Sequence, residues 1–329
     1  MRGKTLDLSG FMLSLVKRKL AAFGDGLSVA WKPGALALLS LLAATTAFAQ
    51  DKDKESTPIA GGKLSLESDF SFAIVGSSNF DLRANSGDVD TYNIGTRDVL
   101  SYKAREGFLV RFGFELQRYN FGVPNDLALP SKLQAASIVI GTDLQLGDAW
   151  IVRLEVQPGY YGGGTKLRGG NFDAPFVIGA SYFVSSDLQL VAGLSVDVER
   201  KYPVLPGLGF RYKYNADVVL DFILPTPRIE YTLNKSVLLY VGGDVQGNTY
   251  RVDSDFGTVH GNSRLNDAWV DYTQIRVGGG ASLKIRPEVT LELEAGVVPV
   301  QEFDFHRADI RSSASQIPPY GGVVLRAAF

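Results

Sequence analysis

The chain of 329 residues contains no cysteine and only two histidines, His260 and His306. Without cysteine there are no disulfide staples, no thiol nucleophiles and no cysteine-ligated metal sites. After residue 49 the sequence also lacks any apolar run close to the length of about eighteen residues that a membrane-spanning helix needs. These absences exclude cysteine-dependent enzymes and argue against a helical membrane protein.

The first fifty residues have the features of an export signal. Basic residues at positions 17–19 precede an apolar run over residues 35–42, and residues 47–49 (Ala-Phe-Ala) form a small-x-small cleavage pattern. The apolar run is too short for an uncleaved membrane anchor. We therefore predict a secreted protein whose mature chain begins at Gln50; initiation at Met12 is compatible with the same signal.

The mature chain is acidic. The first 49 residues carry six basic and two acidic side chains, so the 33 basic and 35 acidic residues of the chain become 27 and 33 after cleavage. A net charge near −6 provides no basic surface for neutralising phosphates. We predict no nucleic-acid partner.

Apolar and polar residues alternate strictly between residues 108 and 117. In a β-strand successive side chains point to opposite faces, so a period of two separates an apolar face from a polar one. The apolar face carries Phe108, Val110, Phe112, Phe114 and Leu116, and the other face carries Arg111, Gly113, Glu115 and Gln117. This pattern predicts a strand with one face toward lipid and the other toward a wet lumen.

The same alternation recurs along the mature chain. It is present at residues 64–74, 138–146, 150–156, 176–182, 188–198, 275–283, 291–297 and 323–329. Alternation in one segment is weak evidence, but its repetition over many segments is typical of a transmembrane β-barrel. The sequence predicts an all-β, antiparallel, up-and-down barrel in the outer membrane of a Gram-negative-type envelope.

The connections predict the number of strands. Short turns are expected at residues 104–106, 147–148, 185–187, 215–217, 234–235 and 286–288, and longer connections near 76–89, 121–131, 160–174, 200–206, 251–267 and 301–318. Six short turns imply about fourteen strands if both ends of the barrel are periplasmic. The segment Leu224-Pro225-Thr226-Pro227 must then be a very short external turn; if it is a bulge inside a strand, twelve strands is the alternative.

The predicted organisation is a signal peptide over residues 1–49, a flexible periplasmic leader over 50–62 and one barrel over 63–329. The terminal Phe329 ends an alternating strand and is predicted to serve as the membrane-insertion signal. The expected partners are therefore the export and barrel-assembly machinery and the lipid of the outer membrane.

One region also has a family resemblance. Residues 206–212 (Pro-Gly-Leu-Gly-Phe-Arg-Tyr) and 220–231 (Leu-Asp-Phe-Ile-Leu-Pro-Thr-Pro-Arg-Ile-Glu-Tyr) resemble a run shared by a family of outer-membrane β-barrel proteins of unknown function. The resemblance is clearest over residues 203–251. It implies a barrel in the outer envelope, and it supplies no catalytic residues.

Charged residues that alternate with lipid-facing positions are predicted to line the lumen. They are Arg111, Glu115, Arg153, Glu155, Asp197, Glu199, Arg211, Lys213, Arg276, Glu292 and Glu294. Both signs are present, so these groups can either face a water-filled pore or pair across strands and close the lumen. A barrel of fourteen strands is wider than side chains readily fill, which favours a pore for small polar solutes or ions. We predict no cofactor and no metal site.

Two other classes of function remain open. A closed barrel can bind a ligand or partner through its surface loops. An enzyme is the third possibility. Omptin-type outer-membrane proteases use the residue types found at Asp88, Asp90, Asp304 and His306. Outer-membrane phospholipases use a histidine and a serine, which are present here as His260 and Ser263. The spacing of His260 and Ser263 is wrong for the phospholipases, and Asp-x-His is common by chance, so we expect no enzyme.

Overall fold

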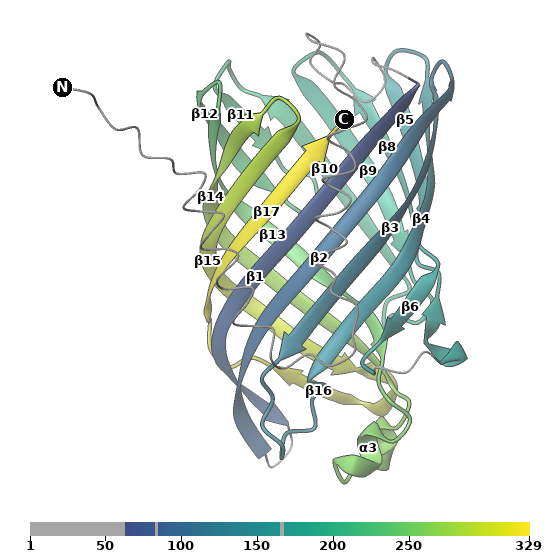
Figure 1. Cartoon of the computed structure of the whole chain (residues 1–329), viewed down its shortest axis with the longest axis vertical. Coiled ribbons are helices and arrows are strands. Elements are labelled where there is room, and N and C mark those ends of the chain that lie inside the picture. The colour runs from purple at the N-terminus through teal and green to yellow at the C-terminus, as the bar shows by residue number, and fades with distance from the viewer. Residues whose placement is uncertain (1–62, 83–84, 165–167) are drawn as a thin grey trace, which may run out of the picture. The chain divides into compact units, whose positions relative to one another are not determined.

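The computed structural model describes residues 63–82, 85–164 and 168–329. The predicted signal peptide and leader lie outside these residues. The described chain forms one sheet, which closes on itself where β1 pairs with β17 (Figure 1). Its strands are β1 (Leu64–Leu82), β2 (Asn85–Arg105), β3 (Phe108–Phe121), β4 (Lys132–Leu146), β5 (Trp150–Val156), β6 (Gly159–Gly162), β7 (Phe172–Asp173), β8 (Phe176–Phe183), β9 (Leu188–Val196), β10 (Val204–Lys213), β11 (Val218–Asp221), β12 (Arg228–Asn234), β13 (Val237–Arg251), β14 (Trp269–Arg286), β15 (Val289–Phe305), β16 (Ile310–Ser313) and β17 (Pro319–Ala328).

Three pairs of these segments are interrupted wall strands. β5 and β6 both pair with β4, β7 and β8 pair with β6 and β5, and β16 and β17 both pair with β15. Each pair therefore occupies one place in the wall, and the barrel has fourteen antiparallel strands. The prediction of about fourteen strands is confirmed, and the alternative of twelve is excluded.

The two ends of the barrel differ in their connections. The short turns that follow β2, β4, β8, β10, β12 and β14 lie at one end, where Leu66 and Phe329 also exchange backbone hydrogen bonds. In outer-membrane barrels this end is periplasmic. On the external side of β11 and β12, these two strands pair directly on either side of the Leu224–Pro227 turn, as predicted.

Two predicted connections are wrong in their extent. Residues 76–89 do not form a long loop, because β1 runs to Leu82, β2 starts at Asn85 and the two strands pair across this region. Residues 301–305 continue β15, and β16 pairs with them. Their inward side chains, such as Phe80 and Phe303, are completely buried, so apolar packing keeps the strands paired beyond the expected ends.

The outer surface of the wall is apolar. Outward side chains at alternate positions, including Phe112, Ile140, Leu154, Ile178 and Leu293, are exposed, whereas the charged residues between them point inward. A closed barrel satisfies every wall hydrogen bond internally, and an apolar outer surface is stable only against lipid. The described chain is thus an outer-membrane β-barrel. Among its described residues, no helix has the length and apolar character required to span a bilayer.

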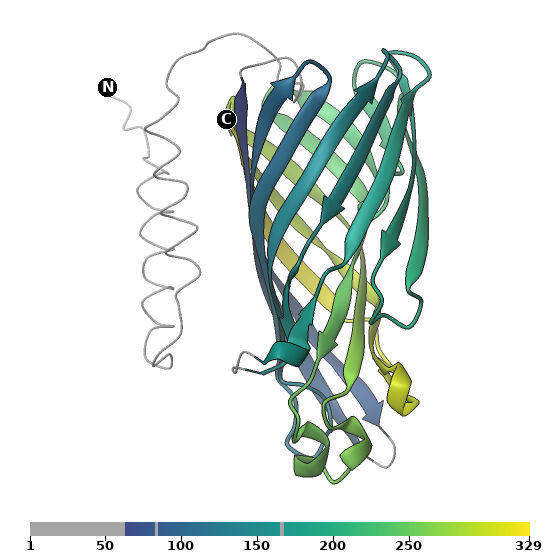
Figure 2. The same ribbon diagram turned by 90° about the vertical axis from the view of Figure 1, so that its right-hand side faces the viewer.

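The external end of the barrel is narrower than the periplasmic end. There β6 meets β13 in a parallel bridge between Gly162 and Arg251, and Phe80 of β1 bridges to Ala314 beyond β16. These contacts bypass β7–β12 and close a smaller ring made of β1, β2, β3, β4, β6, β13, β14, β15 and β16 (Figure 2). We call this part the narrow barrel.

An apolar core fills the narrow barrel. It is built by inward side chains of the long strands, such as Tyr119, Tyr272 and Phe303, together with Leu127 and Leu129 from the β3–β4 connection and Leu265 from the β13–β14 connection. The rings of Tyr272 and Phe303 lie 5.0 Å apart, and that of Phe121 lies 4.9 Å from Phe303. This core, which the alternation of residues 108–117 did not predict, blocks the barrel axis.

Candidate functional site

The inner wall formed by β5, β8, β9 and β10 carries small side chains. Arg153, Gly179, Gly193 and Gly207 lie opposite one another in register across these four strands. A Cβ atom added at Gly207 would have no atom within 4 Å, and one added at Gly179 would have only the Ala192 carbonyl oxygen, at 3.6 Å. At Gly193 an added Cβ would lie 2.9 Å from the Ile178 carbonyl oxygen, so there the strands themselves lie close together. This glycine row therefore leaves the lumen open along one side of the barrel.

The side chains around the glycine row are accessible to water. Arg153 is 46% exposed and Arg211, further along the same wall, is 42% exposed. Their charged groups have partners: Arg153 donates to both carboxylate oxygens of Asp143 at 2.7 Å, and Arg211 pairs with Asp221 at 2.5 Å. Paired yet hydrated charges are what a polar passage requires.

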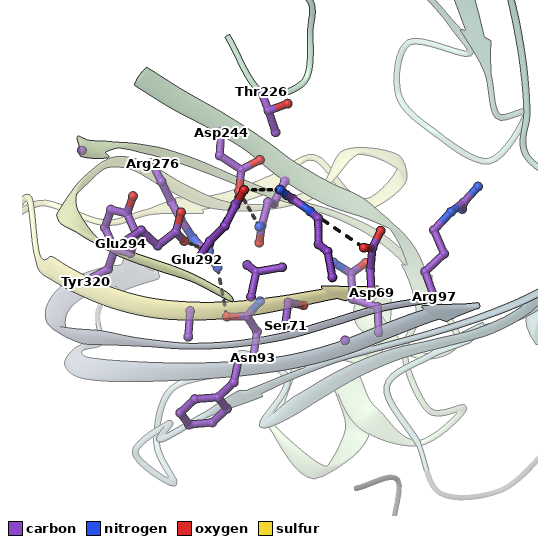
Figure 3. A pocket seen from close by; sticks show the side chains of 18 of the residues that line it. Asp69, Ser71, Asn93, Arg97, Thr226, Asp244, Arg276, Glu292, Glu294 and Tyr320 are labelled. Carbon is purple, nitrogen blue, oxygen red and sulfur yellow. Dashed lines mark hydrogen bonds and ion pairs between the residues drawn. The ribbon is translucent and has the colours of Figure 1, made fainter. Parts of the chain in front are cut away.

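A polar cavity of about 400 Å³ lies toward the opposite wall, lined by β1, β2, β3, β12, β13, β14, β15 and β17 (Figure 3). Arg276 is buried there, donates to Asn93 at 2.9 Å and lies 3.5 Å from Glu294 and 3.9 Å from Asp244. Its guanidinium also lies over the Tyr320 ring, 5.3 Å from the centroid. The cavity thus holds a fixed cation surrounded by acids.

Two more arginines, Arg228 and Arg326, line the same cavity. Arg326 forms an ion pair with Glu292 and lies 3.8 Å from Asp69, and Arg228 lies 3.7 Å from Glu292. Because the acids and arginines come from strands on different parts of the wall, they form a network inside the barrel. Such a network orders water and polar solutes while keeping each charge compensated.

The predicted lumen residues fall into four groups in the structure. Arg111, Glu115, Arg153 and Glu155 lie along β3 and β5; Arg97 of β2 joins Glu115 to Glu155, pairing with Glu155 at 2.6 Å. Arg276, Glu292 and Glu294 belong to the polar cavity, and Arg211 and Lys213 lie at the periplasmic end of β10. Asp197 and Glu199 are not strand residues, because β9 ends at Val196.

Asp197 and Glu199 instead belong to the external connection between β9 and β10. Glu199 pairs with Arg307 at 2.5 Å, and Asp197 lies beside Asp173 of β7. The β9–β10 connection therefore carries charges of both signs, since Lys201 also pairs with Asp304 at 2.7 Å.

Sequence reasoning missed five charged residues of the cavity: Asp69, Arg97, Arg228, Asp244 and Arg326. Three of them had a usable signal, since Asp69 alternates with Phe70 and Phe72, Arg228 with Ile229 and Tyr231, and Arg326 with Leu325 and Ala327. For Arg97 and Asp244 the alternation is too weak, because Thr96 and Asp98 flank Arg97 and Gly243 precedes Asp244.

The residues proposed for hydrolysis do not assemble. Asp88 bonds to Asn79 at 3.2 Å on the exposed side of the β1–β2 hairpin, and Asp90 is also exposed. His306 instead lies 3.6 Å from Asp271 of β14. Within the described ranges, no hydrogen bond or ion pair joins Asp88 or Asp90 to His306, or His260 to Ser263.

Comparison with known families gives one match. The family described as Domain of unknown function (DUF6268) matches residues 114–322, more than half of the chain. The chain belongs to this family. The match begins within β3 and ends within β17, and the predicted resemblance to an outer-membrane barrel family of unknown function is confirmed. No curated protein matches the sequence.

Several solved outer-membrane barrels are distantly similar to this DUF6268 protein. An outer membrane channel from Pseudomonas putida F1 is 9% identical, with 84% of this chain and 100% of that chain covered and a TM-score of 0.44. The translocator domain of the autotransporter NalP from Neisseria meningitidis is 12% identical, with coverage of 90% and 98% and a TM-score of 0.38. The KdgM porin is 10% identical, with coverage of 80% and 99% and a TM-score of 0.33.

Proposed function

We propose that the barrel is a porin-like channel for passive passage of small polar solutes or ions. The glycine row carries this proposal. Gly179, Gly193 and Gly207 are in register on the inner wall, and none of them places a side chain in the lumen. A barrel sealed by its own side chains would have bulky or mutually paired residues at these positions.

The distribution of charge supports the same proposal. Arg153 and Arg211 are paired with acids yet remain 46% and 42% exposed, so water reaches them. By contrast, Arg111 and Arg276 are buried in networks with acids and polar side chains. Solutes would therefore pass along β5 and β8–β10, and the charged network on the other side would hold the wall together.

One observation favours binding at the surface as a second candidate function. The β13–β14 connection at the external tip contains α3 (Phe256–Val259) and η3 (Ser263–Leu265), and Leu265 anchors it in the apolar core. Arg251 adds an ion pair to Asp267 at 2.5 Å. An ordered tip of this kind can present a surface to a ligand or partner.

Liposome swelling distinguishes the two candidates. Vesicles containing the refolded mature chain are placed in isotonic solutions of small sugars of increasing size. The channel proposal expects swelling that is fastest for the smallest sugar and absent with heat-denatured protein. Vesicles that contain folded protein and do not swell with any sugar would overturn it and leave surface binding as the better candidate.

The charge of Arg153 provides a test of selectivity. The Arg153→Gln substitution removes one exposed positive charge from the lumen. The Asp143 carboxylate then has only one ion-pair partner, Arg111, at 3.7 Å. We expect the reversal potential in a KCl gradient to shift modestly toward cation preference. The matched control is Lys235→Gln on the exposed β12–β13 turn, which removes the same charge outside the lumen; an equal shift in both variants would contradict the assignment.

A further inference from the structure

The barrel axis does not provide an external exit. Tyr119, Tyr272 and Phe303 are at most 1% exposed and pack edge to face or tilted against their neighbours in the narrow barrel. Opening an axial path would require separating this apolar core and exposing it to water, at a cost of roughly 1.5–3 kcal/mol for each large side chain. A solute in the lumen needs another way out.

The wall is incomplete where β11 and β12 end. These strands have four and seven residues, whereas the neighbouring β10 and β13 have ten and fifteen. β11 pairs with β10 only at residues 211–213, and the last contacts of β13 with the turn are the hydrogen bonds of Gly243 and Val245 to Pro227 and Pro225. Among the described residues, no strand pairs with the facing edges of residues 204–208 of β10 and 247–250 of β13.

This gap is bounded on every side, and we call it the window. β10 and β13 form its two sides, and the Leu224–Pro227 turn forms its periplasmic edge. At the level of the Leu224–Pro227 turn, where β11 and β12 still separate them, β10 and β13 are three strand spacings apart, or about 14 Å. The β9–β10 connection, residues 197–203, forms the external edge.

The external edge is fastened to the narrow barrel by three polar contacts. The backbone N–H of Lys201 donates to Asp271 of β14 at 2.9 Å, and its ammonium donates to Asp304 of β15 at 2.7 Å. Glu199 pairs with Arg307 of η4 (His306–Ala308) at 2.5 Å. The β9–β10 connection is therefore held across the outside of β14 and β15, so that it does not fold back into the gap.

The lumen reaches the window from inside. Thr226 of the periplasmic edge and Gly243, Asp244 and Gln246 of β13 all line the polar cavity, and Figure 3 shows Thr226 at its margin, apart from the charged groups. On the other side of the window, the open space at Gly207 adjoins the same edge of β10. The cavity and the glycine row thus converge on one opening.

We infer that solutes cross the external half of the barrel through the window between β10 and β13, beside the narrow barrel and not along its axis. This inference rests on the proposed channel function. It assigns the route to a place beside the Leu224–Pro227 segment, which the sequence predicted to be a very short external turn. Leu208, Leu224 and Val245, at the periplasmic part of the rim, are exposed and apolar and face lipid. The external edge instead carries the charged Glu199 and Lys201, so polar solutes leave beside this edge.

Single-cysteine labelling tests the route, because the chain has no cysteine of its own. Thr226→Cys is incorporated into planar bilayers, its current is recorded, and a small cationic methanethiosulfonate is added. A label at position 226 occupies the window, so we expect the current to fall severalfold and to recover on reduction. In the matched control, Ser254→Cys on the exposed β13–β14 connection, labelling should leave the current unchanged.

A third variant tests the axial alternative. Leu129 is buried in the apolar core, so Leu129→Cys should neither react nor change the current. Labelled Thr226→Cys with full current, or block through Leu129→Cys, would overturn the window while leaving the channel function intact. A folded, cysteine-free chain that conducts no current would overturn both.

Discussion

Gly207→Trp is expected to reduce the single-channel conductance at least severalfold while leaving the barrel folded. Gly207 lies in ordinary extended backbone on the inner wall, and nothing lies within 4 Å of the position that a Cβ would occupy. An indole there extends over Gly193 and toward Arg153, filling the open side of the lumen. Pore area falls steeply when one large ring enters a narrow passage.

A lipid-facing residue of the adjacent strand provides the matched control. Leu194 of β9 points outward and is 42% exposed, so Leu194→Trp adds the same ring to the lipid-facing surface. Its conductance should equal that of the parent chain. Equal conductance of all three proteins, each verified by its heat-modifiable mobility in gels, would show that solutes do not pass the glycine row.

Phe303→Ala is expected to destabilise the folded barrel by about 3–5 kcal/mol, the usual cost of truncating a buried phenylalanine. Phe303 is fully buried, and its ring contacts those of Phe80, Phe121 and Tyr272 at centroid distances of 5.7, 4.9 and 5.0 Å. The measurement is urea unfolding of the refolded protein in lipid vesicles, followed by tryptophan fluorescence.

Phe112→Ala serves as the comparison, because Phe112 is 59% exposed on the lipid-facing side of β3. Lipid tails replace the lost ring there without leaving a cavity, so we expect a much smaller loss of stability. If the two variants lose the same stability, the narrow barrel contributes little to folding, and its core is then weak enough to open.

The transmembrane half of the barrel was predictable because two local rules agree there. Alternation places Arg111 inward and Phe112 outward, and turn-forming residues mark the short periplasmic connections. Even the Leu224–Pro227 turn followed from proline chemistry, since proline cannot donate a hydrogen bond within a central strand.

The external half was not predictable from the same rules. Tyr119 and Phe303 face inward, as polar residues do in the other half, and only tertiary packing shows that they fill a core. The narrow barrel also depends on the bridge between Gly162 and Arg251, which are distant in sequence and belong to strands that run in parallel. Periodicity along one strand contains no information about such a bridge.

The sequence predicted several of the inward charged residues of the network, but it did not predict which of them form ion pairs. Alternation identified Glu115 and Glu155 as inward residues, but their common partner Arg97 depends on the register of β2 against β3. A shift of one residue would turn every side chain of a strand to the other face. The partners on neighbouring strands therefore require the structure.

Single-channel recording of the refolded mature chain in a planar bilayer tests the central claim most directly, with the reversal potential measured in a salt gradient in the same experiment. A passage along β5 and β8–β10 predicts uniform conductance steps and an ion preference that responds to Arg153. Absence of current from a folded, heat-modifiable sample would contradict the channel and shift attention to the ordered external tip.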